Sequence, residues 1–376
     1  MVAGAGIIGA SIAYHLSKLG ASVTIIDAEG PATHASRGTF AWINATWAKQ
    51  PHHYHTLNQD GLANWKDLQQ TLDLPIRWHG SLEWFDNGDR QDKLARQIAE
   101  QAEWGERARM VRSSDVLALE PNVEFGDAQY VAFSENDGAI DPVFATKALL
   151  AAAQDMGAVV QYPCKMTGAA LRSGRLARIE TSRGIIKADK LVLATGAAPD
   201  ASKRFAGIDI PQRSTPGVIV TTAPMAGLLN RVLVAPGIHI HQRQDGRVIL
   251  GEQGGAPENE AHAIRLEARP NEFPARVVAE QHADRMLAVA RRFVPGIADA
   301  GIEEVRIGWR PLPIDGHPVL GTSPARPDVY LAIMHSGVTL APIVGQLAAH
   351  ELTEGTPVER LDEYRPDRTF KLIKRY

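Results

Sequence analysis

The sequence predicts an α/β protein of two domains, one built on a parallel sheet and the other, assembled from separate parts of the chain, built on an antiparallel sheet. Three observations support this fold class. The chain has 376 residues, too many for one compact core. It opens with a glycine-rich turn followed by a helical pattern and a short apolar run. Alternating apolar stretches at 232–234, 239–241 and 248–250 are typical of antiparallel strands.

The first residues have the pattern of a Rossmann-type unit. Gly4, Gly6 and Gly9 give the spacing G-x-G-x-x-G. A helix is predicted next, because apolar residues recur at intervals of three and four, and a glycine stands where helices commonly end: Ile8, Ile12, Leu16, Leu19 and Gly20. Ser22 to Ile26 has the composition of a buried strand, and Asp27 follows it. The order of strand, glycine turn, helix, strand and acid predicts a dinucleotide site.

Each position in this pattern has a physical reason. Gly4 allows a tight turn, Gly6 allows the backbone to approach a pyrophosphate, and Gly9 allows the helix to pack on the sheet. Asp27 can accept hydrogen bonds from a ribose diol. The alternative is a chance glycine turn between a strand and a helix. Only three residues precede Gly4, so the first strand is expected to be short.

Two later segments have related patterns. Residues 185–198 predict a strand that runs into a tight turn at Ala194-Thr195-Gly196. Val329 to Ile333 predicts a strand, and residues 335–342 are expected to lead from it into an apolar helix that ends at about Thr353. Backbone N–H groups at the start of that helix can stabilise negative charge on a ligand. The alternative is an ordinary helix N-cap at Ser336.

These segments together resemble the D-amino acid oxidase family of FAD-dependent oxidoreductases, which includes glycine oxidase, sarcosine oxidase and bacterial amino acid dehydrogenases. The resemblance covers nearly the whole chain in order. Besides the N-terminal motif it rests on 35–38 (ASRG), 80–82 (GSL), 119–121 (LEP), 137–142 (DGAIDP), 194–196 (ATG), 308–321 (GWRPLPIDGHPVLG) and 335–342 (HSGVTLAP). It implies an FAD-binding domain from 1–78, 140–205 and 306–376, and a substrate domain from 79–139 and 206–305.

The resemblance implies non-covalent FAD. Cys164 is the single cysteine, is expected in a strand as a small buried hydrophobe, and does not match the cysteine that anchors flavin in some sarcosine oxidases. By alignment, the backbone of Met166 meets the adenine, with a plain core methionine as the alternative. The expected cofactor-binding residues are Gly4, Gly6, Ile7, Ile8, Gly9, Asp27, Ala28, Ser36, Arg37, Gly38, Thr39, Met166, Ala194, Thr195, Gly196, Gly308, Ser336, Gly337, Val338, Thr339 and Leu340.

The resemblance also implies a substrate site around Arg310. In the family an arginine at this place binds the substrate carboxylate, and a planar guanidinium matches a carboxylate with two parallel hydrogen bonds. The alternative is a structural salt bridge. His239 and His241 lie two residues apart, so they are expected on one face of a strand, with His239 lining the pocket or both serving as ordinary sheet residues. His335 precedes the flavin loop and is expected either to cap it or to face the substrate.

A histidine-rich segment at 51–55 raises the question of a metal site. No carboxylate accompanies these histidines at ligand spacing, so no metal is expected. The segment is expected instead to begin a helix through Leu57, Leu62 and Trp65, with Lys49 and Tyr54 near the flavin. The formal net charge of −3 does not indicate a basic surface that would bind nucleic acid. No apolar run is long enough to span a bilayer.

The function implied is FAD-dependent oxidation of the C–N bond of a small amino acid or secondary amine. In this hypothesis the carboxylate pairs with Arg310, hydride passes to flavin N5, and the imine is hydrolysed. The alternatives are oxidation of a 2-hydroxy acid or polyol, an NAD-dependent dehydrogenase, a flavin subunit of a heteromeric amine or opine dehydrogenase, and a catalytically silent FAD-binding module. The electron acceptor is oxygen, a quinone or a carrier protein. A cytoplasmic setting is the expectation, and the sequence leaves open whether the chain forms a homo-oligomer or needs a heteromeric partner.

Overall fold

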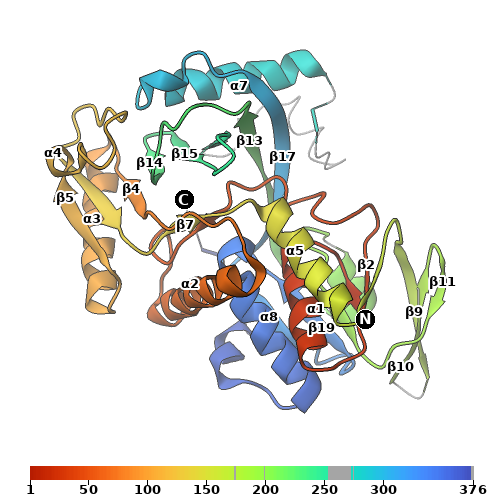
Figure 1. Ribbon diagram of the computed structural model, residues 1–376. Helices are drawn as coiled ribbons and strands as arrows, with labels where there is room; N and C mark the ends of the chain where they lie inside the picture. Colours follow the sequence, from red (N-terminus) through yellow and green to blue (C-terminus); the bar gives the residue numbers. More distant parts are fainter. Residues whose placement is uncertain (173–174, 199, 253–271, 274, 374–376) are drawn as a thin grey trace.

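A computed structural model describes the chain except residues 173–174, 199, 253–271, 274 and 374–376. Two large sheets organise these residues, one of six strands and one of eight. Figure 1 shows the larger sheet beneath the helix α7 (Arg276–Ala290) and the smaller one beside α1 (Ile7–Lys18) and α8 (Gly337–Glu354). The predicted α/β class, with a parallel and a largely antiparallel sheet, is confirmed.

The six-stranded sheet contains the N-terminal glycine motif. Its order is β18 (Val319–Thr322), β19 (Val329–Ile333), β12 (Leu191–Leu193), β1 (Val2–Ala3), β2 (Thr24–Ile26) and β8 (Val159–Gln161). All neighbours are parallel except β18 and β19. The first strand has two residues, as its short sequence predicts, and still lies in the middle of the sheet, paired with β12 and β2.

The two faces of this sheet are covered differently. On one face α1, α8, α2 (His52–Leu72) and α5 (Pro142–Asp155) share a single apolar core. On the other face a second core includes residues of β9 (Met166–Arg172) and β10 (Arg175–Thr181), which with β11 (Gly184–Ile186) form a three-stranded sheet. The motif helix α1 is therefore packed in the core that it shares with α5 and α8, which fixes its N-terminus in place.

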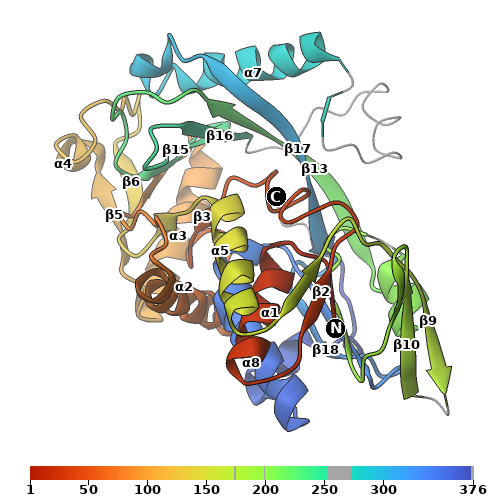
Figure 2. The same cartoon turned by 45° about the vertical axis from the view of Figure 1, so that its right-hand side comes forward.

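The eight-stranded sheet collects strands from distant parts of the chain. Its order is β17 (Ile302–Pro313), β13 (Gln212–Thr222), β16 (Val248–Glu252), β15 (Ile238–Gln242), β14 (Val232–Ala235), β4 (Ser81–Glu83), β6 (Tyr130–Ser134) and β5 (Ala108–Arg112). Only β14 and β4 pair in parallel among them. The long strands β13 and β17 run from beneath α7 toward the six-stranded sheet (Figure 2).

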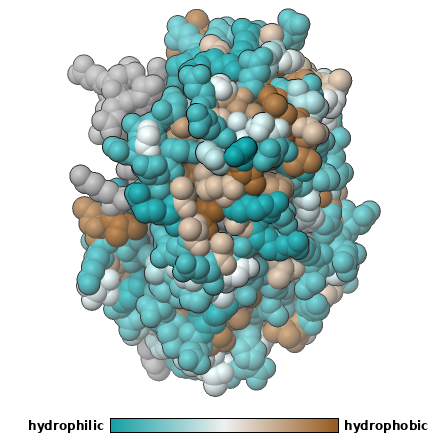
Figure 3. All heavy atoms as spheres, turned by 90° about the vertical axis from the view of Figure 1, so that its left-hand side faces the viewer, coloured by the Kyte–Doolittle hydropathy of each residue, from teal (hydrophilic) through white to brown (hydrophobic). Residues whose placement is uncertain are grey.

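The remaining elements are short or peripheral. Strands β3 (Trp42–Ile43) and β7 (Gly138–Ala139) pair with each other, and α4 (Ser113–Val116) is a single turn. One π-helical turn (Ser202–Ala206) and two 3₁₀ turns (Pro295–Ile297 and Glu359–Tyr364) connect larger elements. Helix α3 (Gly88–Glu103) buries only Leu94, Ile98 and Gln101, and the side of the molecule that carries it is mainly hydrophilic (Figure 3).

Several expected details differ from the structure. The charged stretch from Gln91 to Ala108 predicts one helix, but α3 ends at Glu103, because Ala108 begins β5 and pairs with Ser134. Leu19 follows α1 and is exposed, so the apolar face of that helix ends at Leu16. Cys164 is fully buried as expected but lies between β8 and β9 rather than in a strand. The described residues contain no helix with the length and apolar character needed to cross a membrane.

Candidate active site

A cavity of about 490 Å³ lies between the two sheets and joins the glycine motif to the eight-stranded sheet. We call one part of its wall the glycine end, formed by Gly4, Gly6, Asp27, Ser36 and Thr195. We call another part the aromatic end, formed by Phe40, Trp42, Trp47, His239 and Arg310. Residues from both sheets and from the start of α8 therefore contribute to one continuous site.

Backbone atoms pack closely at the glycine end. Gly4 has a φ of 106°, a conformation that side chains disfavour, and a Cβ there would overlap the carbonyl oxygen of Ala194. A Cβ at Gly9 would overlap the carbonyl oxygen of Gly4, so α1 rests directly on the turn. A Cβ at Gly6 would lie 3.1 Å from Ser36 Oγ. The sequence pattern is thus explained by clearance between backbone segments.

Two polar side chains fix the rim of the glycine end. The hydroxyl of Ser36 accepts a hydrogen bond of 2.9 Å from the backbone N–H of Ile7, at the start of α1. The carboxylate of Asp27 accepts from the backbone N–H groups of Ala5 (2.8 Å), Glu29 (2.9 Å) and Gly30 (3.0 Å). These bonds orient a carboxylate on the cavity wall at the end of β2, where a ribose diol is expected.

The start of α8 is held by one side chain from α2 and one from the segment before it. Ser336 has a φ of 59° and its side chain makes no capping bond, so it is not an ordinary N-cap. Its hydroxyl oxygen accepts from Lys49 Nζ at 2.6 Å and from the Tyr54 hydroxyl at 3.2 Å. The ring Nδ1 of His335 lies 3.3 Å from the same oxygen. The first turn of α8 therefore lines the cavity with a lysine beside its positive dipole end.

Arg310 stands on the cavity face of β17. It pairs with Thr215 across the sheet, and a Cβ at Gly217 would lie 2.8 Å from its Nη2, so a glycine is needed for the guanidinium to lie along β13. Within the part of the chain that the structure describes, its side chain forms no hydrogen bond or ion pair. The alternative of a structural salt bridge is therefore not found among those residues.

His239 and His241 lie on the same face of β15, as their spacing predicts. His239 lines the cavity, whereas His241 is buried behind it with Nε2 2.8 Å from the carbonyl oxygen of Phe40. Burial and the nearby positive charge of Arg310 lower the pKa of His239 to about 3. Burial and the charge of Arg243 lower the pKa of His241 to about 3 as well. Both imidazoles are neutral at working pH.

A family model supports the interpretation of this geometry. Residues 1–351 match the model described as FAD dependent oxidoreductase, the family of D-amino acid oxidase. The chain belongs to this family. The resemblance seen in the sequence is confirmed, and FAD is the cofactor of this FAD-dependent oxidoreductase.

Some relatives match this chain over nearly their whole length, and others match it over only part of their length. Glycine oxidase of Bacillus licheniformis is 25% identical, over 98% of this chain and 96% of its own. The 4-methylaminobutanoate oxidase of Paenarthrobacter nicotinovorans is 25% identical over 95% of this chain, which spans only 44% of that protein. The structure of glycine oxidase from Geobacillus kaustophilus superposes with a TM-score of 0.86 at 21% identity, covering 98% of each chain, and shows the same fold.

The cavity fits FAD on grounds internal to this structure. Gly4 and Gly6 line the cavity with backbone alone, and the first residues of α1, Ile7 and Ile8, lie on the same wall. Thr195 Oγ1, Asn44 Oδ1 and His239 Nε2 are buried on the cavity wall without a hydrogen-bond partner among the described residues. Buried polar atoms are normally paired, and a ligand in the cavity would supply partners for these three. The glycine end would hold the pyrophosphate and ribose of FAD, and the start of α8 would contact its ring.

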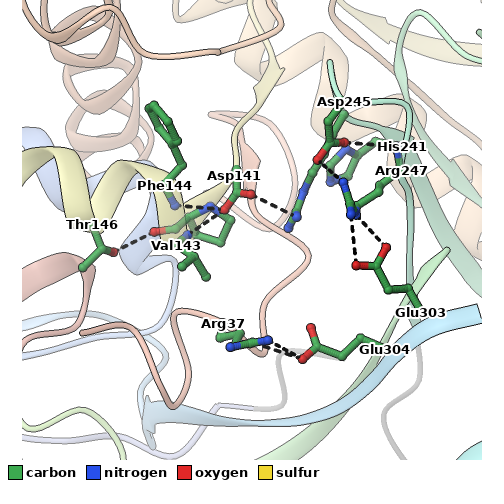
Figure 4. Close-up of polar contacts among 12 residues, drawn as sticks. Arg37, Asp141, Val143, Phe144, Thr146, His241, Asp245, Arg247, Glu303 and Glu304 are labelled. Atoms are coloured by element: carbon green, nitrogen blue, oxygen red, sulfur yellow. Dashed lines mark hydrogen bonds and ion pairs between the residues drawn. The ribbon is translucent and has the colours of Figure 1, made fainter. Parts of the chain in front are cut away.

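The structure brings most of the expected residues to the cavity and leaves five outside its wall. Gly9 packs against Gly4, and Leu340 is buried in the helical core. Ala28 is exposed, and Met166 packs in the core with β9 and β10. Arg37 turns away to bind Glu304 at 2.7 Å (Figure 4). The expected residues that do line the cavity are Gly4, Gly6, Ile7, Ile8, Asp27, Ser36, Gly38, Thr39, Ala194, Thr195, Gly196, Gly308, Ser336, Gly337, Val338, Thr339, Arg310, His239 and His335.

Sequence reasoning missed much of the segment between β2 and α2. Phe40, Trp42, Asn44 and Trp47 all line the cavity. Three aromatic residues within eight positions, directly after the Ser-Arg-Gly segment, were the available signal. No group of histidine, cysteine or carboxylate side chains suited to a metal occurs among the described residues.

Proposed function

We propose that this protein oxidises the C–N bond of an amino acid or secondary amine that carries a carboxylate. The observation that supports the proposal most is the placement of Arg310. Its guanidinium lies on the cavity wall, has no ion-pair partner among the described residues, and shares the cavity with the first turn of α8. Relatives of this chain are named for oxidising glycine and 4-methylaminobutanoate, both amines with a carboxylate.

In this proposal Arg310 binds the substrate carboxylate with two parallel hydrogen bonds and orients the carbon to be oxidised. Neutral His239 adds no second positive charge and offers one hydrogen bond from the same wall. The aromatic rings around it exclude water, which favours the neutral form of the substrate amine. A neutral amine has the lone pair needed to form a C=N bond. We assign His335 a place beside the reacting end, next to Ser336.

The reaction removes two electrons and two protons from the substrate. A hydride leaves the carbon, a proton leaves the nitrogen, and the C–N bond becomes C=N. Bound FAD supplies the two-electron acceptor for this step. Water then adds to the imine and releases a keto acid or aldehyde together with ammonia or an amine. We leave the final electron acceptor as oxygen, a quinone or a carrier protein.

An anaerobic titration of the FAD-loaded protein tests the proposal. Glycine, sarcosine, other amino acids of both configurations and 2-hydroxy acids are added while the absorbance near 450 nm, typical of oxidised flavin, is followed. Bleaching by an amino acid or amine supports the proposal. Bleaching only by a hydroxy acid contradicts it and favours the alternative. A chain that bleaches with none of them would point to a partner-dependent enzyme.

Replacing Arg310 by alanine tests the residue assignment. Loss of a charge-assisted bidentate pair should raise the KM for a carboxylate substrate about 10- to 100-fold. Arg247→Ala provides a matched control, because Arg247 binds Asp245 and Glu303 outside the cavity (Figure 4). A change in KM below about threefold in Arg310→Ala would assign carboxylate binding to another residue.

A further inference from the structure

Three aromatic rings and one imidazole enclose the aromatic end of the cavity. The ring centroid of His239 lies 5.3 Å from that of Phe40, 6.1 Å from that of Trp42 and 5.7 Å from that of Trp47. Trp42 and Trp47 lie 6.4 Å apart, and Phe85 supports Trp47 from behind at 6.1 Å. These distances are those of rings in direct contact, so the four side chains form one continuous wall, which we call the aromatic wall.

The indole nitrogen of Trp42 is turned away from the cavity. The indole N–H of Trp42 donates to Asp137 Oδ2 at 3.0 Å, and Asp137 also accepts from the Ser81 hydroxyl at 2.6 Å. Because Asp137 does not line the cavity, this bond fixes the ring with its nitrogen toward the protein interior. The surface that Trp42 offers to a ligand is therefore carbon.

His239 supplies the polar atom of the wall. Its Nε2 is buried and has no hydrogen-bond partner among the described residues. An unpaired buried polar atom destabilises the protein, and a ligand that forms a hydrogen bond with it removes that cost. A ligand at this wall should therefore combine apolar surface with a polar group close to His239 and Arg310.

Charge decides which kind of ligand this is. An aromatic wall can bind a cation, but here the nearby Arg310 already acts on His239 with a positive charge. Glu252, which also lines the cavity, pairs with Ile238 in the sheet and reaches the opposite side to bind Arg285 of α7. Only its Oε1 is paired there, and its Oε2 is buried with no hydrogen-bond partner among the described residues. The positive charge of Arg310 disfavours a second cation next to His239, and the carbon surface of the rings favours an uncharged apolar group.

We propose that the substrate is an amino acid with an apolar side chain of about the size of leucine or phenylalanine, whose side chain lies against Phe40, Trp42 and Trp47 while its carboxylate binds Arg310. This inference rests on the proposed function and narrows its substrate class. It also distinguishes this chain from relatives named for glycine, whose substrate has no side chain. Burial of such a side chain should favour leucine over glycine about 10- to 100-fold in kcat/KM.

Binding of unreactive carboxylates tests the inference without turnover. Acetate and 4-methylpentanoate share the carboxylate, and only the second carries the apolar chain of leucine. Each is titrated into the FAD-loaded protein, and the perturbation of the flavin spectrum gives its Kd. We expect 4-methylpentanoate to bind at least about tenfold more tightly. Equal affinities would overturn the inference, even if amino acids reduce the flavin. Tight binding of 4-methylpentanoate without reduction by any amine would instead contradict the proposed function alone.

Substitution of the wall gives a second test. Trp47→Ala should lower the ratio of kcat/KM for leucine over glycine about tenfold or more, because it removes apolar contact only from the larger substrate. Trp104→Ala is the matched control, since Trp104 contacts His52 and His55 away from the cavity. It should leave the ratio within about twofold. An unchanged ratio in Trp47→Ala, or a preference of the native protein for glycine, sarcosine or lysine, would overturn the proposal.

Discussion

The two ends of the cavity are built in different ways. At the glycine end the critical atoms belong to the backbone, and Gly4, Gly9 and Ala194 approach so closely that a single Cβ would overlap a carbonyl oxygen. At the aromatic end the critical atoms belong to side chains such as Trp42 and His239. The first end therefore tolerates almost no substitution, while the second can change its ligand by changing one ring.

This difference separates retention of the cofactor from choice of the substrate. In our proposal the glycine end binds groups that every FAD molecule carries, so its constraints are the same for any substrate. The aromatic end is assembled from the segment 40–47 and from strands β15 and β17. In our proposal its residues determine the size and polarity of the substrate side chain. Substitutions at the two ends should therefore have separable effects, the first on flavin content and the second on selectivity.

The largest effect is expected at the glycine end. Gly6→Val should reduce the FAD retained after gel filtration by about tenfold or more, because branched carbons would occupy the space next to Ser36 Oγ. Flavin content is measured as the ratio of the absorbance of the flavin, at about 450 nm, to that of the protein, at about 280 nm. Gly88→Val serves as the control, since a Cβ there meets nothing within 4 Å. A variant that remains yellow and fully loaded would show that this turn does not hold the pyrophosphate.

The second largest effect is expected on the free energy of unfolding, at Asp137, which binds Trp42 behind the aromatic end. Burial raises the pKa of Asp137 from 3.8 to about 8, so the folded protein holds a proton that the unfolded chain releases between these values. The free energy of unfolding should therefore fall as the pH rises from about 4 to 8. Asp137→Asn cannot titrate, and its melting temperature relative to the native protein should rise between pH 5 and pH 8.

The test depends on how the difference in melting temperature between Asp137→Asn and the native protein changes with pH. Circular dichroism at several pH values measures it, with Asp92→Asn on the exposed side of α3 as the control. Because the carboxamide oxygen can still accept from Trp42 Nε1, the aromatic wall should persist, and 4-methylpentanoate should bind with unchanged affinity. A melting difference independent of pH would mean that Asp137 is ionised in the folded protein.

The glycine end was largely predictable from the sequence, and the reason is local. The turn, α1 and β2 with Asp27 are consecutive, so their spacing alone predicts their meeting. Even there, Leu19 was wrongly assigned to the buried face of α1. Its spacing continues the apolar pattern, but α1 ends at Lys18, one residue earlier. The expected strand at Cys164 also failed, since 162–165 forms the connection between β8 and β9.

The aromatic end was predictable only in part. The resemblance to a family indicated Arg310 and His239, but nothing in the sequence links Trp42 to His239, which lie 197 positions apart and meet only through the folding of both sheets. The contact of Arg37 was likewise not predictable from nearby residues in the sequence. Its neighbours suggested a ligand contact, whereas long-range packing places it beside Glu304 of β17.

The smallest effect on flavin content is expected for Arg37→Ala. This variant tests whether FAD retention depends on backbone clearance, as at Gly6, rather than on a nearby side chain. Arg37 directly follows Ser36, which lines the cavity, yet its guanidinium binds Glu304 with the two side chains 43% and 29% exposed. Such a pair contributes about 1 kcal/mol or less, and Glu304 keeps a second partner in Arg306 at 2.6 Å. Flavin content and the Kd for FAD should therefore change less than about threefold, as measured by titration of the flavin-free protein. If Arg37→Ala loses FAD as Gly6→Val is expected to, the guanidinium must leave Glu304 when the cofactor binds, and the glycine end would then depend on a side chain as well as on backbone clearance.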